Sequence, residues 1–91
     1  MNKTRRNELQ KQVNALEELK SQLEDIKSEI ENIHDDEDEA YSNLPEGIQD
    51  SERGETMQEN IDNLDDAYSN LDDVISYIED AIDNITEVIE R

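Results

Sequence analysis

Several residue types that shape a fold or carry chemistry are missing from this sequence or rare in it. It has no cysteine, tryptophan or phenylalanine, and only one histidine, one proline and two glycines in 91 residues. Without cysteine the chain can form neither a disulfide framework nor a thiolate zinc site, which is typical of intracellular proteins. No apolar run approaches the ~20 residues needed to span a bilayer, and no hydrophobic signal core follows the basic start at residues 1–6. We therefore expect a cytoplasmic protein.

Residues suited to catalysis are also scarce. The single histidine, His34, has no cysteine to act with, the serines lie outside any nucleophile motif, and no glycine-rich phosphate loop is present. Carboxylate pairs are plentiful, but we expect them on a convex helix face, where no cavity could raise one pKa or hold a substrate. The sequence therefore predicts a protein that is not an enzyme and that needs no cofactor.

Five consecutive acids follow His34 and are the best candidates for a metal site. They are Asp35, Asp36, Glu37, Asp38 and Glu39. An EF-hand loop needs a glycine within such a run, and none occurs. Because consecutive acids on a helix point in all directions, they cannot converge on one ion. We expect weak, diffuse binding of divalent cations, no dedicated metal site, and a solvated His34.

Basic residues are few, and the balance of charge is extreme. Eight Lys and Arg residues stand against 27 acids, which gives a net charge of −19. Nucleic acids and anionic membrane surfaces should repel such a chain, so we expect neither as a direct partner. High net charge with only 32% hydrophobic residues would normally favour disorder. The regular spacing of those hydrophobic residues argues for an ordered fold instead.

The apolar residues of the second half follow a seven-residue repeat. From Met57 to Ile89 they recur at alternating steps of four and three, as in a helix that packs along its whole length. With Ile61 at position a, smaller residues at g widen the apolar face to suit a helix with two neighbours. These g residues are Ala67, Val74, Ala81 and Val88. We expect an oligomer seam formed by a and d residues, namely Ile61, Leu64, Tyr68, Leu71, Ile75, Ile78, Ile82 and Ile85.

The first third of the chain predicts another long helix. Leucine or isoleucine recurs every seven residues from Leu9 to Ile30 at position a. Leu19, Ile26 and Ile33 interleave with them at d, so we expect these residues to face the second helix as well. Pro45 should end the helix, because the residue before a proline is disfavoured in the α region.

The predicted fold is all-α and forms one domain over residues 1–91. We expect helices at about 4–43 and 52–90, joined by a turn at 44–51, in a long antiparallel two-helix hairpin of the coiled-coil type. Residues whose numbers sum to about 98 should then lie opposite one another. Because two helices that share one apolar stripe are marginal in isolation, we expect a homodimer that forms a four-helix assembly.

The acids are distributed unevenly along this hairpin. Residues 1–34 have a net charge of −1, residues 35–54 of −7 and residues 55–91 of −11. On the second helix acidic pairs at e and f recur every ~10.5 Å along one side. We define the acidic rail as Asp65, Asp66, Asp72, Asp73, Glu79 and Asp80. We expect a partner to bind the rail together with residues 35–39; Tyr77, expected to be exposed, is either a further contact or simply solvated.

The turn carries a resemblance to a known group of proteins. Residues 41–55 read YSNLPEGIQDSERGE, and residues 57–64 read MQENIDNL. With Asn-Leu-Pro-Glu and Ser-Glu-Arg-Gly-Glu between two helices, the segment resembles a group of short acidic helical-hairpin proteins of phages and prophages of Gram-positive bacteria. The resemblance covers roughly residues 24–82. It implies a hairpin fold and a mobile-element origin, hence action in a host cell's cytoplasm, and it assigns no activity to any residue.

Two functions of different classes remain open. DNA-binding proteins recognise rows of phosphates through Lys and Arg in a groove, and a stiff helix with rows of carboxylates could occupy that groove. We expect a non-catalytic acidic binding protein, a phage-type DNA mimic that blocks a basic nucleic-acid-binding host protein such as a defence nuclease (anti-CRISPR or anti-restriction type). The alternative is a structural or adaptor coiled coil that acts through its apolar seam, and whose charge only keeps it soluble.

Overall fold

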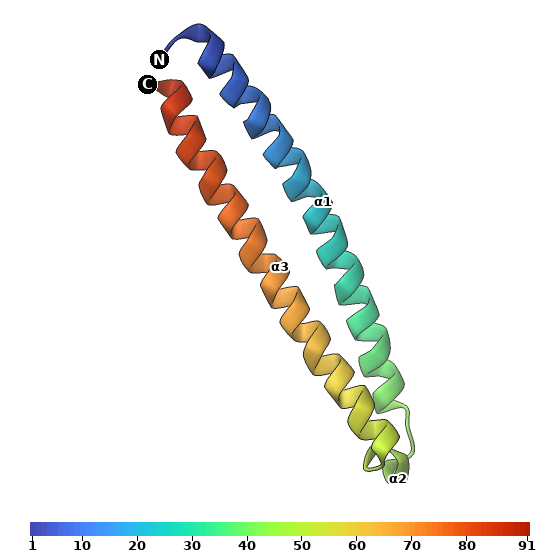
Figure 1. The fold of residues 1–91 in the computed structure, drawn as a ribbon. Helices are drawn as coiled ribbons and strands as arrows, with labels where there is room; N and C mark the ends of the chain where they lie inside the picture. Colours follow the sequence, from blue (N-terminus) through green and yellow to red (C-terminus); the bar gives the residue numbers. More distant parts are fainter.

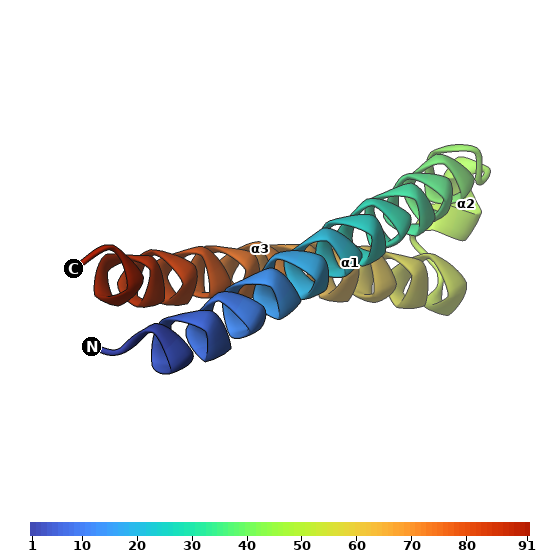
Figure 2. The ribbon, with the colours of Figure 1, turned by 90° about the horizontal axis from the view of Figure 1, so that it is seen from above.

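The fold is a long hairpin of two helices. The computed structural model describes all 91 residues, with α1 at Lys3–Ser42, the short α2 at Glu46–Gln49 and α3 at Glu52–Glu90. α1 and α3 run antiparallel, with both termini at one end of the rod and α2 at the other (Figure 1). The rod measures 69 × 15 × 13 Å, and the two long helices cross rather than lying strictly parallel (Figure 2). The expected all-helical hairpin is confirmed; the helix α2 inside the turn was not expected.

Ion pairs between the two long helices define how they are aligned. Lys20 pairs with Glu79 and Lys27 pairs with Asp72. The residue numbers in each pair sum to 99, one more than the sequence predicted. Near the turn, Asn60 Nδ2 donates a hydrogen bond to Glu37 Oε2 over 2.9 Å. The predicted antiparallel register is therefore confirmed from the middle of the rod to the turn.

Very little of the chain is fully buried. Val13, Ile61 and Ile75 are the only buried hydrophobic residues. They lie at three separate levels of the rod, and the other a and d residues of α3 are only partly covered. Each complete burial of such a side chain contributes about 1.5–3 kcal/mol. A single hairpin therefore holds a thin seam rather than a core.

α1 is rotated about its axis relative to the sequence prediction. Leu19, Ile26 and Ile33 were expected to face α3 from position d, but they remain 45%, 50% and 52% exposed. Their place in the seam is taken by the e residues, which are Val13, Lys20, Lys27 and His34. The rotation brings the cationic e residues within reach of acids on α3, while lysine stems cover the seam with their methylene groups.

The residues at the N-terminal ends of α1 and α3 are of types that favour a helix start. Asn2 caps α1, since its Oδ1 accepts a hydrogen bond of 2.8 Å from the backbone N–H of Arg5. Ser51 stands at the N-cap of α3, but its hydroxyl donates back to the carbonyl oxygen of Ile48 and does not cap the helix. Glu52 and Glu55 lie in the first turn of α3, where the helix dipole favours negative charge.

The turn is held together by one side chain and one glycine. Gln49 Nε2 lies 3.2 Å from the carbonyl oxygens of Tyr41 and Leu44, and so ties the end of α1 to the segment that follows it. The first turn of α3 packs so closely on α2 that a Cβ atom on Gly54 would lie 2.5 Å from the carbonyl carbon of Gln49. Gly54 is therefore a position where the two helices are in close backbone contact.

Candidate partner-binding surface

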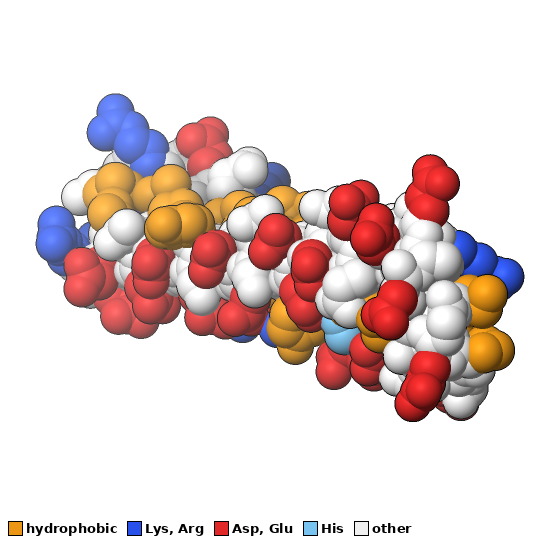
Figure 3. Space-filling view, turned by 90° about the horizontal axis from the view of Figure 1, so that it is seen from below, with side chains coloured by type: hydrophobic (Ala, Val, Ile, Leu, Met, Phe, Trp, Pro, Cys, Tyr) orange, Lys and Arg blue, Asp and Glu red, His pale blue; other side chains and the backbone are white.

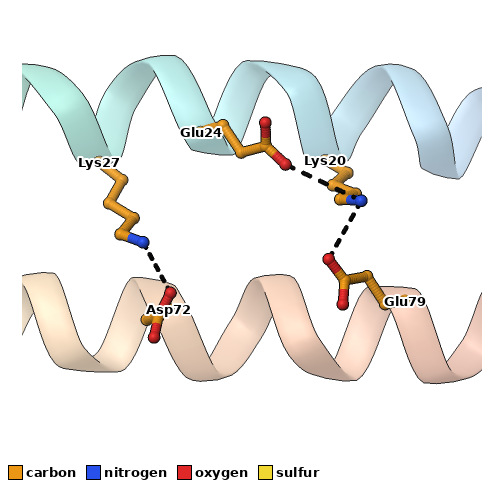
Figure 4. Close-up of polar contacts among 5 residues, drawn as sticks. All are labelled: Lys20, Glu24, Lys27, Asp72 and Glu79. Carbon is orange, nitrogen blue, oxygen red and sulfur yellow. Dashed lines mark hydrogen bonds and ion pairs between the residues drawn. The ribbon is translucent and has the colours of Figure 1, made fainter.

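Half of the acidic rail is engaged by cations from α1. Lys27 Nζ lies 2.6 Å from Asp72 Oδ1, and Lys20 Nζ lies 3.0 Å from Glu79 Oε1 (Figure 4). Lys20 is also 3.9 Å from Glu24 on its own helix. The third acid of this kind, Asp65, contacts His34. We call Asp65, Asp72 and Glu79, all at position e, the paired row.

The ion pairs shift the titration of both lysines in the same direction. The hydrogen bond to Glu79 raises the pKa of Lys20 above its usual value, helped by the nearby negative charges of Glu79 and Glu24. The hydrogen bond to Asp72 likewise raises the pKa of Lys27. Lys27 also lies 4.7 Å from the centre of the Tyr68 ring, close enough for a cation–π contact. Both lysines therefore stay charged throughout the physiological range.

His34 lies between the helices, contrary to the expectation that it would be solvated. Its Nδ1 is 3.0 Å from Asp35 Oδ1, and its Nε2 is 2.8 Å from Asp65 Oδ1. The Nε2 atom is itself covered, and its contact with Asp65 is a close ion pair without hydrogen-bond alignment. The hydrogen bond to Asp35, supported by the charge of Asp65, raises the pKa of His34 against the opposing effect of burial. His34 thus extends the row formed by Lys20 and Lys27, and adds a positive charge to it when the imidazole is protonated.

The other half of the rail is free of such partners. Asp66, Asp73 and Asp80 are exposed on α3, and no Lys, Arg or His nitrogen lies within 4 Å of them. We call these three residues the free row; they fall at position f. Seven residues of helix separate each from the next, or about 10.5 Å. The acidic rail was predicted as one surface. It consists of the paired row, whose acids contact Lys20, Lys27 and His34 of α1, and the free row, whose acids contact no basic residue.

The acidic run at residues 35–39 is divided among different faces of α1. Asp35 contacts His34, and Glu37 accepts the hydrogen bond from Asn60 across the hairpin. Asp36 and Glu37 line one shallow groove, on the side of α1 away from His34, while Asp38 and Glu39 are exposed. The expectation that these acids point in different directions is confirmed, and no three His, Asp or Glu side chains are grouped so that they could hold a metal ion.

Other residues predicted to meet a partner take different positions. Tyr77 is 73% exposed on α3, which leaves it accessible for contact. Of the predicted oligomer seam, Ile61 and Ile75 are already buried in the single chain. The remaining members, Leu64, Tyr68, Leu71, Ile78, Ile82 and Ile85, are partly covered.

One face of the rod is apolar and open. It consists of Leu19, Ile26 and Ile33 on α1 and Val74 on α3, each 43–52% exposed. Around Ile33 it continues into the shallow groove, where Leu64 and Asn60 of α3 form the other wall. The cations of α1 are on the opposite flank of the seam, because they fall at position e. We call this surface the open apolar face.

Acidic side chains are spread along the length of the rod, while most basic side chains gather towards its ends (Figure 3). No helix is long and apolar enough to cross a membrane. No protein-family model, curated protein or solved structure matches the chain.

Sequence reasoning missed the residues that position the rail. Lys20, Lys27 and His34 recur every seven residues on α1, at the same heptad position that the paired row occupies on α3. In an antiparallel hairpin two e positions share one flank, so this spacing was a usable signal. Gln49 and Asn60 gave none, because a single amide side chain has no periodicity.

Proposed function

We propose that this chain is a non-catalytic acidic binding protein that occupies the nucleic-acid groove of a basic partner, and in this way imitates DNA. The linear density of its charge carries the proposal. Nineteen net negative charges on a rod of 69 Å correspond to one charge per about 3.6 Å. One strand of B-DNA carries one phosphate per about 3.4 Å. A groove that attracts a DNA strand should therefore attract this rod about as strongly at long range.

The free row supplies the contacts in this proposal. Asp66, Asp73 and Asp80 have no cation of their own chain to give up, so Lys and Arg of a partner can pair with them without breaking an internal bond. The paired row contributes differently. Its ion pairs with Lys20, Lys27 and His34 fix the alignment of α3 on α1, and so hold the free row on a straight support.

The partner class follows from the same charge. A basic nucleic-acid-binding protein complements the rod, whereas nucleic acid itself and anionic membranes repel it. The resemblance of the turn to hairpin proteins of phages favours a host defence nuclease as the target, of the kind that anti-CRISPR or anti-restriction proteins block. Such a protein would act in the cytoplasm of the host cell.

Capture of proteins from a bacterial lysate by the immobilised chain tests the proposal. We expect nucleic-acid-binding proteins to be captured, and to be released both by duplex DNA and by about 1 M salt, at which the Debye length falls to about 3 Å. The free-row variant Asp66→Asn/Asp73→Asn/Asp80→Asn should lose about tenfold to a hundredfold in affinity, from three contacts of about 0.5–1 kcal/mol each.

A matched variant separates contact from general charge. The paired-row variant Asp65→Asn/Asp72→Asn/Glu79→Gln removes the same number of charges, yet should lose less affinity and more thermal stability, since it removes the ion pairs that Lys20, Lys27 and His34 make with α3. Full binding by the free-row variant, or capture that duplex DNA does not reverse, would rule out DNA imitation.

The exposed residues Leu19, Ile26 and Ile33 favour one alternative, an adaptor that binds a helix through the open apolar face. Capture through that face would survive high salt, because apolar contacts are not screened. It would be lost on the substitution Ile26→Asp, which leaves the rail intact.

We also propose that two hairpins pair into a four-helix assembly. Three fully buried hydrophobic residues are few for a chain of 91 residues, and helices depend mainly on tertiary packing of their apolar face for stability. Pairing would leave the rail accessible if the contact is made away from position f.

A further inference from the structure

The open apolar face has a shape and a sequence that suit one particular occupant. Its α1 part is a straight row at position d, with Ile26 in the middle and Leu19 and Ile33 one heptad to either side. Beyond them position d holds no large hydrophobic residue: it is occupied by Gln12 and Arg5 on one side and by Ala40 on the other. Only a register centred on Ile26 sets all three large side chains against one another when two copies of this row meet antiparallel.

The charges of the rod decide the orientation. Residues 1–11 hold four Lys or Arg and one acid, whereas residues 35–54 hold eight acids and one Arg. Two copies with their turns at the same end would bring both acidic turns together. Two copies with their turns at opposite ends instead keep the acidic turns apart and place the basic residues 1–11 of each α1 beside the acidic turn of the other, which is the less repulsive arrangement.

The chain also exposes more surface than a compact protein of its mass would. The chain has 6665 Å² of accessible surface, while a compact protein of its mass would have about 5,500 Å². The excess of about 1,200 Å² per chain is spread over the whole rod, and a second copy that lies along one side, burying roughly 800 Å² of each chain as in an interface of standard size, would cover much of it.

We infer that the open apolar face binds the same face of a second copy, with the two α1 helices antiparallel and Ile26 opposite Ile26 of the partner copy. This inference rests on the pairing proposed above and adds the face, the orientation and the register. It also replaces the seam predicted from the sequence, because Ile61 and Ile75 are occupied by α1 of their own chain. Both rows of the rail stay outside the contact.

Single-cysteine cross-linking tests the inference directly, since the chain has no cysteine of its own. Ile26→Cys should form a covalent dimer under mild oxidation, because the two thiols would meet on the symmetry axis. Ser28→Cys is the matched control on the opposite side of the same helix and should remain uncross-linked. Leu19→Cys should not link to itself, because about 21 Å of helix separate the two sites and a disulfide needs Cα atoms within about 7 Å. Mixed with Ile33→Cys, it should form a heterodimer.

Each result has one meaning. Sedimentation of the wild-type chain as a monomer would overturn the proposed pairing itself. A dimer in which Leu19→Cys links to itself would overturn the orientation, and a dimer in which Ser28→Cys links while Ile26→Cys does not would overturn the face. As a check without cysteine, Ile26→Asp should give helical monomers, whereas Ser76→Asp, at an exposed position on the other side of α3, should leave the dimer intact. A dimer that survives Ile26→Asp would also overturn the inference.

Discussion

Replacement of Gly54 by alanine should destabilise the hairpin, although alanine is the better helix former. A Cβ atom at this position would lie 2.5 Å from the carbonyl carbon and 2.7 Å from the Cα atom of Gln49. Carbon atoms pack favourably at about 3.5–4.0 Å, so α2 would have to move away from α3 by about 1 Å. The obstacle is backbone, which cannot rotate out of the way as a side chain could.

The size of the effect follows from what that movement breaks. Gln49 would lose its contacts with the carbonyl oxygens of Tyr41 and Leu44, at about 1 kcal/mol for each hydrogen bond. Overpacking typically adds about 1–3 kcal/mol, and the higher helix propensity of alanine offsets about 1 kcal/mol. We expect a net loss of about 3 kcal/mol, or a decrease of roughly 10–25 °C in melting temperature for a chain of this size.

The other glycine provides the matched control. Gly47 also lies in a helix, but a Cβ atom there would meet nothing within 4 Å, and its φ is not positive. Gly47→Ala should therefore stabilise the chain by up to about 1 kcal/mol. Thermal unfolding followed by circular dichroism at 222 nm, at one fixed chain concentration, compares the two variants. A Gly54→Ala chain that melts at or above the wild-type temperature would show that the turn has no such close contact.

Two further predictions concern charge. Because Asp35 and Asp65 raise the pKa of His34 in the folded state, the stabilisation that they give is complete below the unfolded pKa of about 6.5; it should be lost as the pH rises through the higher folded pKa. Melting temperatures measured from pH 6 to 9 should therefore decrease more for the wild type than for His34→Gln, and equal slopes would contradict the role of His34. Added sodium chloride should raise the wild-type melting temperature, because it screens the repulsion within a net charge of −19 more than it weakens exposed ion pairs worth about 0–1 kcal/mol each. A melting temperature that falls with salt would mean that the ion pairs outweigh the repulsion.

The sequence predicted the hairpin because two independent signals agreed. The repeat from Met57 to Ile89 fixed the face of α3, and Pro45 marked the end of α1. The orientation of α1 about its own axis was predicted wrongly, because a hydrophobic pattern counts Ile26 as seam and Lys27 as solvent. Such a pattern does not show that the methylene groups of Lys27 can cover apolar surface while its ammonium group reaches Asp72.

The candidate surface was predictable only in outline. The exposure of the acids follows from their heptad positions, so the location of the rail on α3 could be read from the sequence. Its division into a paired and a free row could not, because the division depends on which cations of α1 face the same flank. The close backbone contact between Gly54 and Gln49 could not be predicted either, since it depends on the unexpected helix α2 folding back onto α3.

The two ends of the rod differ in how they are closed. At one end the chain itself joins the helices, and Gln49 and Gly54 hold the junction. At the other end the nearest fully buried side chain is Val13, ten residues into α1. Since each layer of such a rod contacts only its neighbours, as in repeat proteins, separation of the helices can begin at the termini without disturbing the turn. A partly opened chain then keeps Glu37 aligned with Asn60, so the helices rejoin in the same register and cannot slip by a heptad.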